Sequence, residues 1–438
     1  MSAPIGDLVS EADYTVALGQ RMREARKQQH LALQDVEALS AGEFKTSILG
    51  AYERGERVIS VPRLARLAAI YRVPVERLLP VDPRPATTAS DPFGVYVHIP
   101  FCVHRCDYCA FATWTDRDHL IERYMAALIT DISRADLAPV SSVFVGGGTP
   151  TRVPGSLLAE VIQAIPLQAG AEVTVESNPD DITVGLLRTY RAAGVNRISL
   201  GVQSMVDHVL ASLGRTHNPL NVRRAVEAVE AADIPTFNLD LIYGAAGESL
   251  ADWEHTVGAA LALNPSHISA YALTIEAGTP LSNDESRHPD DDDLADKYEL
   301  ADEMLSAAGL VNYEVSNWAL PGHECRHNIL YWRQQNYLGF GAAAHSHRDG
   351  HRWWNLRTPE RYLAAVEAGE STEAAGETLD DETRRLEGLQ LSLRMTDGVP
   401  SEALDSAELG DLVVDDGTRV RLTRRGRLLA SEVSMRLR

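Results

Sequence analysis

The chain lacks an apolar run long enough to cross a membrane, and its first residues lack the features of an export signal. Residues 1–7 hold neither a basic stretch nor an apolar core. Cysteine is also scarce, with four residues among 438. These absences predict a protein of the reducing cytoplasm in which structural disulfides have little part. Hydrophobic residues make up an ordinary 45% of the chain, whose length suits two or three domains.

Three of the four cysteines nevertheless lie within eight residues, as Cys102, Cys106 and Cys109. This spacing sets three thiolates around a tight loop. Thiolates are the usual ligands of a four-iron cluster, so three would hold three irons and leave the fourth iron open to a substrate or cofactor. Structural zinc, with His104 or Cys325 as its fourth ligand, is the alternative, followed by a disulfide. We expect a 4Fe-4S cluster in this loop.

Basic residues are a minority and are unevenly placed. The chain has 41 Lys and Arg against 62 Asp and Glu, a formal net charge of −21. Residues 15–80 reverse the balance with a net charge of +4, so the remainder carries −25. An acidic body does not attract nucleic acid through its overall field. Only the first segment is therefore a candidate for binding nucleic acid.

That first segment has the pattern of a small helical domain. Helical periodicity covers residues 18–26, 33–39, 47–55 and 61–71, and a last turn is expected at 75–79. Gly55 suits a C-terminal helix cap, and Pro62 suits a helix start. A proline-flanked stretch follows. We assign residues 15–80 to a helical domain and 81–92 to a linker.

From residue 93 the pattern changes to strands that alternate with helices. Expected strands cover residues 94–99, 142–145, 173–176, 197–201, 236–242 and 267–274, and expected helices include 120–135, 157–165 and 222–232. Such alternation predicts an α/β fold with parallel strands. Six units are fewer than the eight of a complete barrel, so we predict a partial (β/α)6 barrel over residues 93–310. Unusual residues end these strands, where active sites of such folds lie.

The rest of the chain has a different pattern. Residues 311–378 form an extension of the barrel. Residues 379–438 combine an expected helix at 381–393, a turn at 398–400, a hairpin at 412–422 around Asp416-Gly417, and a final helix at 427–437. We interpret residues 379–438 as a small winged-helix-like cap.

A glycine-rich motif, Gly146-Gly-Gly-Thr-Pro150, directly follows the second expected strand. Glycine lets a backbone approach a ligand closely. Together with the cysteine loop and the six strand–helix units, this motif resembles the radical S-adenosylmethionine (SAM) superfamily. Further segments resemble its coproporphyrinogen oxidase-like branch, and they cover residues 176–179, 194–204, 213–215, 238–244, 273–280 and 313–318. The resemblance extends over about residues 91–438.

The resemblance implies roles for particular residues. In this superfamily the open iron binds the amino and carboxylate groups of SAM, and an electron from the cluster cleaves the sulfonium to a 5′-deoxyadenosyl radical. Cys102, Cys106 and Cys109 match the cluster ligands. The positions implied to contact SAM are Tyr96, Gly147, Gly148, Thr149, Glu176, Gln203, Arg215 and Asp240. A zwitterionic ligand needs a carboxylate and an arginine, which agrees with this set. Taken singly, each charged residue could instead belong to an ordinary ion pair.

Two features separate members of the branch. Oxygen-independent coproporphyrinogen oxidases carry a further cysteine at the position of Phe111, whereas the radical SAM heme chaperones carry phenylalanine there. The stretch His327-Asn-Ile-Leu-Tyr-Trp332 resembles the heme-associated motif of those chaperones. The resemblance implies that His327 binds heme iron and that Tyr331 and Trp332 face the macrocycle. The alternative is a packed segment in which hydrogen bonds satisfy His327.

The N-terminal segment resembles the helix-turn-helix domains of the lambda repressor-like class, most clearly in residues 47–56. Residues 33–39 and 46–54 would form the helix-turn-helix pair. The side chains that would meet phosphates or bases are Lys45, Ser47, Arg54 and Arg57. A protein-docking or dimerising domain is the alternative.

Three functions compete. The first is a heme chaperone that uses a cluster and SAM and delivers heme to acceptor proteins. The second is a coproporphyrinogen III oxidase or dehydrogenase, which Phe111 disfavours. The third is a heme- or redox-responsive transcription regulator, supported by the N-terminal domain alone. A dimer is expected if the protein binds a two-part DNA site, and no catalytic side chain is assigned.

Overall fold

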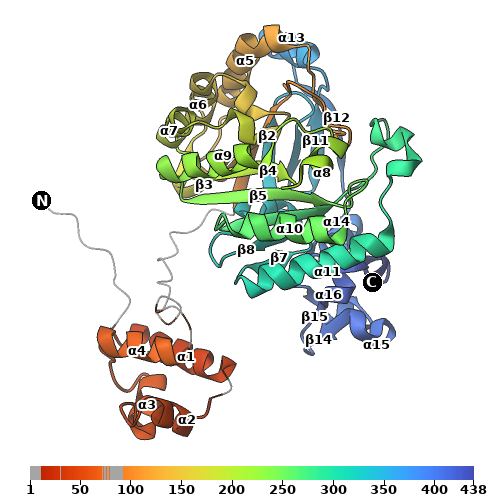
Figure 1. Cartoon of the computed structure of the whole chain (residues 1–438). Coiled ribbons are helices and arrows are strands. Elements are labelled where there is room, and N and C mark those ends of the chain that lie inside the picture. Colours follow the sequence, from red (N-terminus) through yellow and green to blue (C-terminus); the bar gives the residue numbers. More distant parts are fainter. Residues whose placement is uncertain (1–10, 30, 72, 74, 76–77, 79–91) are drawn as a thin grey trace, which may run out of the picture. The chain divides into compact units, whose positions relative to one another are not determined.

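The computed structural model describes residues 11–29, 31–71, 73, 75, 78 and 92–438 (Figure 1). The chain divides into two compact units, residues 1–89 and 90–438. The predicted linker at 81–92 lies outside the described residues except for Pro92, and so does most of the predicted turn at 75–79. Within the described part, no helix has the length and apolar character needed to span a membrane.

The first unit contains the four predicted helices. They are α1 (Glu11–Gln28), α2 (Leu33–Leu39), α3 (Thr46–Glu53) and α4 (Val61–Tyr71). Their apolar faces enclose a core that includes fully buried Val36, Phe44, Leu49 and Leu67. Helix α1 starts earlier than predicted, because Thr15 and Leu18 extend its buried face toward the N-terminus.

The second unit is built on six parallel strands that neighbour one another in chain order. They are β1 (Phe93–Ile99), β2 (Val140–Gly147), β3 (Leu167–Ser177), β4 (Arg197–Gln203), β5 (Thr236–Tyr243) and β6 (His267–Ala272). All six were predicted from the sequence. Helices follow the strands and lie along the outside of the sheet (Figure 1): α5 (Ile121–Arg134), α6 (Gly155–Gln163), α7 (Val184–Ala192), α8 (Asp207–Ser212), α9 (Pro219–Ala231) and α10 (Leu250–Leu261). The predicted α/β fold with a partial barrel is confirmed.

Side chains alternate between the two faces of these strands. Val95 and Val97 of β1 pack into the core beneath the helices, whereas Tyr96 between them lines an interior cavity. The same cavity is polar on its other walls, where Glu176, Ser199 and Asp240 alternate with buried aliphatic residues. Period-two alternation of this kind makes one face of a strand apolar and the other available for chemistry.

Further strands extend this sheet at both edges, which the sequence did not predict. Within residues 92–438 the sheet has twelve strands. Strand β9 (Asn336–Phe340) pairs in parallel with β1, and β10 (His345–Arg348), β11 (His351–Asn355) and β12 (Glu373–Thr378) continue antiparallel from it. At the other edge β8 (Asn317–Ala319) pairs with β6, followed by β7 (Val311–Glu314). The remaining helices of this region are α11 (Asp291–Ala307), α12 (Arg326–Trp332) and α13 (Pro359–Ala368).

The C-terminal region holds a helix and a small separate sheet. The helix is α14 (Asp381–Ser392), and the strands β13 (Val399–Pro400), β14 (Val413–Asp415) and β15 (Arg419–Leu422) pair in the order β13-β15-β14. The predicted hairpin around Asp416-Gly417 is present. The single final helix predicted at 427–437 is wrong, because α16 (Arg424–Leu428) and α17 (Ala430–Ser434) are separated at Leu429, whose backbone leaves the helical region. A short helix α15 (Ser406–Leu409) completes this region.

Short 3₁₀ turns connect several of these elements. They span Asp118–Leu120, Pro150–Arg152, Pro179–Asp181, Leu281–Asn283, Glu285–Arg287, Ser401–Ala403 and Gly410–Leu412.

Candidate cluster and cofactor site

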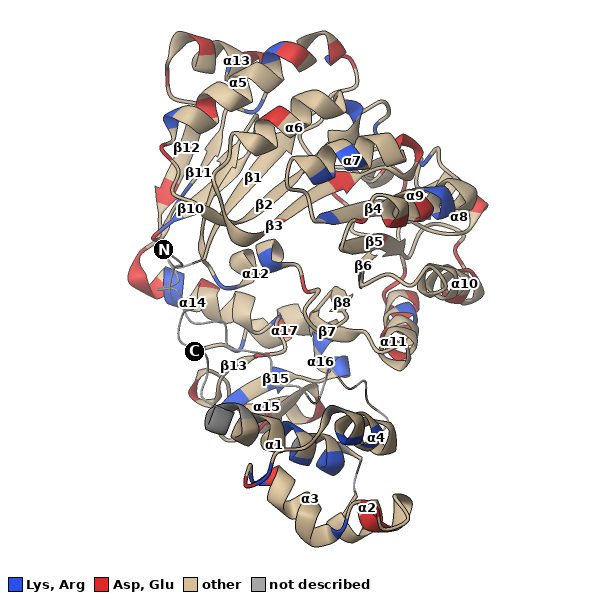
Figure 2. Cartoon of the chain, turned by 90° about the vertical axis from the view of Figure 1, so that its left-hand side faces the viewer, with Lys and Arg blue, Asp and Glu red and all other residues tan. Residues whose placement is uncertain are grey.

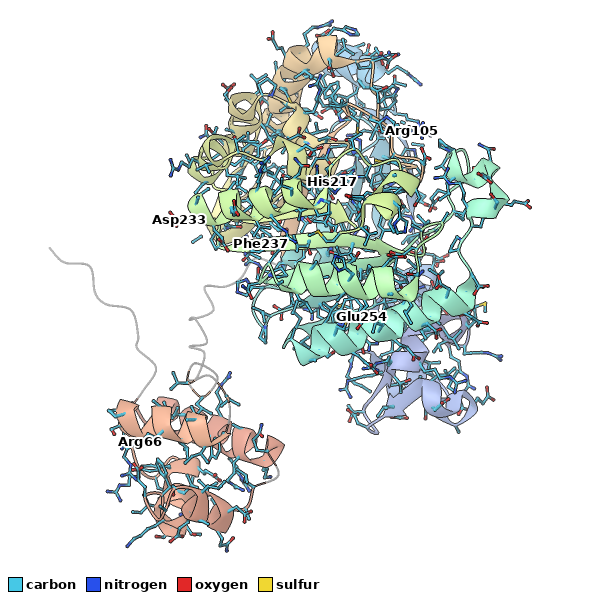
Figure 3. The ribbon with its side chains drawn as sticks, viewed as in Figure 1. Arg66, Arg105, His217, Asp233, Phe237 and Glu254 are labelled. Carbon is cyan, nitrogen blue, oxygen red and sulfur yellow. The ribbon has the colours of Figure 1, made fainter. Side chains whose placement is uncertain are left out.

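The cysteine loop follows β1 directly and is held by backbone hydrogen bonds. The Cys102 amide donates to the Trp114 carbonyl at 3.0 Å, and the Trp114 amide donates to the Pro100 carbonyl at 2.8 Å. Farther along the loop, the Asp107 carbonyl accepts from the Leu281 amide at 3.1 Å, and the Asp107 carboxylate pairs with Arg287 at 2.9 Å. These hydrogen bonds and the ion pair fix the path of the loop. Arg105 on the loop and Phe237 near the start of β5 mark opposite ends of the strands (Figure 3).

The three loop cysteines line one cavity of about 630 Å³ together with most of the predicted SAM-contacting residues. The predicted residues that share its wall are Gly147, Gly148, Thr149, Glu176, Gln203, Arg215 and Asp240. Tyr96 instead lines the smaller interior cavity, which shares Gly147, Glu176 and Asp240 with the first. The topology brings these residues together because the parallel strands all end at the same edge of the sheet.

The glycine motif packs so closely against His98 and the cysteine loop that it cannot accommodate side chains at Gly147 and Gly148. Gly147 has a φ of +108°, and a Cβ on it would lie 2.4 Å from the His98 ring. A Cβ on Gly148 would lie 2.8 Å from the carbonyl oxygens of Ile99 and Phe101 and 3.0 Å from the sulfur of Cys102. The motif is fixed against the cysteine loop by the amides of Gly148 and Thr149, which donate to those same carbonyls at 2.7 and 2.8 Å.

Two donors reach the cysteine sulfurs. Thr149 Oγ1 lies 3.5 Å from Cys102 Sγ, and Arg215 Nη1 lies 3.5 Å from Cys106 Sγ. Arg215 is oriented by Asn178 Oδ1 at 2.8 Å and by the Gly201 carbonyl at 2.9 Å. Its Nε is buried without a hydrogen-bond partner in the described structure. A hydroxyl and a guanidinium placed in this way can donate hydrogen bonds to cysteine sulfurs.

Two carboxyl groups face the cavity in a desolvated setting. Burial, and then the proximity of Asp240, raises the pKa of Glu176 to about 7. Burial also raises the pKa of Asp240, which accepts hydrogen bonds from Ser199 at 2.8 Å and from Asn238 at 2.7 Å. Glu176 Oε2 accepts from the Gly147 amide at 3.1 Å. A cationic group entering the cavity would therefore meet carboxylates that lack a full counter-charge.

The backbone is strained at the end of β4. Gln203 has a φ of +62°, uncommon for a residue with a side chain, and the register between β4 and β5 shifts between Gly201 and Gln203. This bulge lies where the strand meets the cavity. Local strain of this type collects at binding sites because the surrounding fold maintains it.

Tyr96 takes part in a chain of hydrogen bonds beside the cysteine loop. Its hydroxyl lies 2.9 Å from Nδ1 of His98, and Nε2 of His98 lies 2.9 Å from the Ala112 carbonyl. A carbonyl only accepts, so Nε2 carries the proton and Nδ1 accepts from the Tyr96 hydroxyl. Burial lowers the pKa of His98 to about 4, in keeping with this neutral ring.

The donor set fits a cluster better than a single metal ion. In the described part of the chain, no group of three or more His, Cys, Asp or Glu side chains is arranged around one ion. A four-iron cluster places each thiolate on a different iron, so its ligands stand farther apart than those of zinc. Cys325 lies away from the loop, buried beside Glu172, which excludes it as the fourth zinc ligand in this fold. The unpartnered Arg215 Nε, the bare glycines and the facing carboxyls fit a zwitterionic cofactor.

The stretch with the histidine motif forms helix α12, which packs against β1 and β2. His327 is fully buried. Its Nδ1 lies 2.9 Å from Ser142 Oγ, and its Nε2 lies 2.8 Å from the Tyr331 hydroxyl. Burial lowers the pKa of His327 to about 3, and its ring stacks on Phe144 at 5.4 Å. Both ring nitrogens of His327 therefore have hydrogen-bond partners, as expected if this segment serves packing and does not bind heme.

A second cavity, of about 850 Å³, adjoins the cysteine site. Ala110 and Phe111 line both cavities. Its other walls include Tyr331 of α12, Tyr337 of β9, and His345 and Trp354 of β10 and β11. Phe111 is 64% exposed, so it is available as a surface between the two spaces.

Sequence reasoning missed several residues of these cavities. Asn178 orients Arg215, and Ser199 binds Asp240, yet neither was assigned a role. A usable signal existed, since both lie in segments quoted for the family resemblance and Ser199 alternates with buried aliphatic residues.

Comparisons with known proteins show which proteins this chain is similar to. Residues 96–260 match the radical SAM superfamily. Over 384 residues the chain is 41% identical to the heme chaperone HemW of Mycobacterium tuberculosis H37Rv, which covers 82% of this chain and 98% of that relative. The solved structure of coproporphyrinogen III oxidase (HemN) from Escherichia coli, a radical SAM enzyme, aligns with a TM-score of 0.70 and 21% identity over 79% of this chain and 90% of that one. The DNA-binding domain of BldD aligns with 47% identity and a TM-score of 0.16, over 16% of this chain and 100% of that one.

Proposed function

The chain belongs to the HemW family of radical SAM heme chaperones, and on that premise we propose that it binds a 4Fe-4S cluster, SAM and heme and delivers heme to acceptor proteins. The observation that supports this most strongly is the cavity that Cys102, Cys106 and Cys109 share with the glycine motif and the carboxyl groups of Glu176 and Asp240. Three thiolates with a neighbouring binding space are what an open-iron cluster requires.

In this proposal the protein's own residues bind and orient the cofactors. Cys102, Cys106 and Cys109 hold the cluster, and Thr149 and Arg215 stabilise its sulfurs. When bound, the reduced cluster supplies one electron to the sulfonium of SAM. Glu176 and Asp240 attract the ammonium group, while the backbone of Gly147 and Gly148 allows close approach. Tyr96 and Gln203 complete the set of proposed SAM contacts.

Phe111 favours a chaperone over an oxidase. It occupies the position where coproporphyrinogen oxidases of this branch have a further cysteine, and its exposed ring offers no metal ligand and no proton. The coproporphyrinogen oxidase activity remains the alternative function for this fold.

The proposal predicts two results for the anaerobically reconstituted protein. It should bind heme, seen as a Soret band that saturates near one equivalent, and it should not convert coproporphyrinogen III to protoporphyrinogen IX in the presence of SAM and reductant. Conversion above the rate of a Cys102→Ala control would support the oxidase function instead. Absence of heme binding would contradict the proposed chaperone function.

Binding of iron by His327 is a narrower proposal. It requires one ring nitrogen of His327 to exchange its hydrogen bond, to Ser142 or to Tyr331, for the iron. His327→Ala should weaken heme binding if the ring is used. Unchanged affinity would assign His327 to packing alone.

We also propose that the first unit binds DNA. Lys45, Ser47, Arg54 and Arg57 are all exposed around α3, the second helix of the predicted helix-turn-helix pair. Lys and Arg also mark α1 and α4 (Figure 2). Arg54 is paired with Glu56 at 2.7 Å, so it would have to exchange that partner for a phosphate. A docking domain for a protein remains the alternative.

A further inference from the structure

The second cavity has the size and lining of a site for a flat aromatic ligand. At about 850 Å³ it lies in the upper part of the range for small-molecule pockets. Tyr331 and Tyr337 meet edge to face at 4.6 Å on one wall, and Trp354 lies on another. Aromatic side chains in such walls provide large apolar contact with a macrocycle.

Three histidines line this cavity, and they differ in whether their ring nitrogens form hydrogen bonds. Both ring nitrogens of His98 do so, one with the Tyr96 hydroxyl and the other with the Ala112 carbonyl. His347 is engaged by the Gln335 carbonyl at 3.1 Å and by the Gly350 amide, which donates to it at 3.3 Å. His345 is exposed, and within the described residues neither of its ring nitrogens has a hydrogen-bond partner. Its ring is oriented by stacking on Trp354 at 5.7 Å with an interplanar angle of 29°.

The arginines that line the cavity also differ in whether they already have partners. Arg352 forms ion pairs with Glu377 at 2.7 Å and with Glu387 at 3.0 Å. Arg357 and Arg361 are exposed, and in the described structure their guanidinium groups have neither an ion pair nor a hydrogen bond. Two unpaired guanidiniums at the edge of an aromatic cavity suit a ligand with two carboxylates.

We infer that this cavity is the heme site, with His345 in place of His327 as the ligand of the iron and Arg357 and Arg361 as partners of the two propionates. The inference rests on the proposed heme-binding function and specifies where that heme lies. An unengaged imidazole is the side chain that a heme iron requires on its axial side.

The position of the cavity adds a functional consequence. Because Ala110 and Phe111 line both cavities, the bound heme would lie beside the cysteine loop. Phe111 would then contact the macrocycle, and the position that holds a cysteine in the oxidases would here form part of the heme-binding surface.

Heme titration of the full-length, cluster-reconstituted protein tests the iron ligand. His345→Gly should weaken hemin binding at least tenfold and alter the Soret maximum, and added imidazole should restore the wild-type spectrum by entering the vacated space. His255→Ala, which changes an exposed histidine on α10 away from the cavity, should have no effect. If His345→Gly binds hemin with wild-type affinity and spectrum while the wild type binds normally, the inference is wrong and the chaperone function stands. If the wild type binds no hemin, the proposed function itself fails.

Hemin with esterified propionates tests the arginines. The double variant Arg357→Gln, Arg361→Gln should bind ordinary hemin several-fold more weakly than the wild type does, yet match it in binding the dimethyl ester. Equal affinity of both proteins for ordinary hemin would contradict the assignment of the propionates. Iron content and circular dichroism should be unchanged in each variant.

Discussion

At the scale of single residues, the cluster site depends on positions where a side chain does not fit. Gly148→Ala would place a methyl group against two carbonyl oxygens and the sulfur of Cys102. We expect most of the visible absorbance of the cluster to be lost after reconstitution, together with about 1–3 kcal/mol of stability from overpacking. Iron content and thermal unfolding measure the two effects.

Gly185→Ala is the matched control for this change. Gly185 lies in α7, where a Cβ would meet nothing within 4 Å. It should leave the cluster intact and raise the stability slightly, since alanine is the better helix former by roughly 0.5–1 kcal/mol. If Gly148→Ala behaved like this control, the close approach of the glycine motif to the loop would not matter for the site.

Glu176 makes the stability of the apo protein depend on pH. Folding raises the pKa of this carboxyl from 4.5 to about 7, so the folded state binds the proton more tightly. The contribution is complete below about pH 4.5 and is lost as the pH rises to about 7. Glu176→Gln should therefore remove a decline of about 1–3 kcal/mol between these pH values.

Denaturant unfolding of both proteins across this pH range gives the comparison. Glu314, whose pKa burial also raises to about 7, is present in both and cancels in the difference. SAM affinity of the wild type should move in the opposite direction and increase with pH, because the ionised carboxylate attracts an ammonium group. Parallel stability curves for the two proteins would show that the carboxyl titrates at its ordinary pKa.

Residue-level chemistry was predictable where the chain itself brings the groups together. Cys102, Cys106 and Cys109 lie in one loop, and the glycine motif ends a strand. Arg357 and Arg361 were not predicted, and no heme role was assigned to His345, because their relation to the cysteine loop exists only after β9 has paired with β1, more than 230 residues away in sequence. Ring nitrogens are likewise free or engaged according to tertiary contacts, which the sequence does not show.

At the scale of elements, a buried ion pair joins α1 to α3. Arg26 donates to Glu53 through Nε at 2.6 Å and through Nη2 at 2.8 Å, and both residues are buried. Arg26→Ala would leave the Glu53 carboxylate buried without a counter-charge. We expect a loss of about 3–5 kcal/mol, measured by thermal unfolding of the first unit as residues 1–90.

The exposed pair of Arg54 and Glu56 provides the contrast. Its two hydrogen bonds are as short as those of the buried pair, but water surrounds both side chains. Arg54→Ala should therefore destabilise the first unit much less than Arg26→Ala does, because solvent weakens an exposed ion pair. If Arg26→Ala and Arg54→Ala lowered the stability equally, burial would not explain the stabilisation that the Arg26 pair provides.

Elements were predictable where local pattern and tertiary role agree. Helices α2 and α4 were predicted with their observed ends, and all six parallel strands were found. The edge strands β10–β12 were missed because they are half-exposed and charged, and β12 is exposed throughout. The last helix was predicted as continuous because nothing in its sequence marks the break at Leu429. Its first part is fixed instead by Arg424 and Arg427, which pair with Asp302 of α11.

At the scale of the whole molecule, the two units differ in their content of acidic residues. Because most acidic residues fall in the second unit, duplex DNA should bind a fragment of residues 1–90 and not a chain that lacks them. Affinity of the fragment should fall steeply between 50 and 200 mM salt, since each phosphate contact releases counterions. Tight binding should need two copies on a two-part site.

Selection from a random duplex library, followed by titration of the enriched sequence, measures the DNA affinity of the fragment and its salt dependence. Lys45→Ala with Arg57→Ala should reduce both the affinity and its salt dependence, whereas heme binding by the full chain should be unchanged. If no sequence is enriched and the segment instead captures a defined protein partner, the first unit is a docking domain and the regulator function loses its support.

Electron paramagnetic resonance of the reduced, reconstituted protein tests the central claim most directly. The claim is that three thiolates hold a four-iron cluster whose open iron accepts SAM. The wild type should give the signal of a reduced 4Fe-4S cluster, and SAM should shift it. Cys325→Ala should match the wild type, and alanine at Cys102, Cys106 or Cys109 should abolish the signal. A signal that SAM leaves unchanged, or one that survives loss of a loop cysteine, would contradict the account.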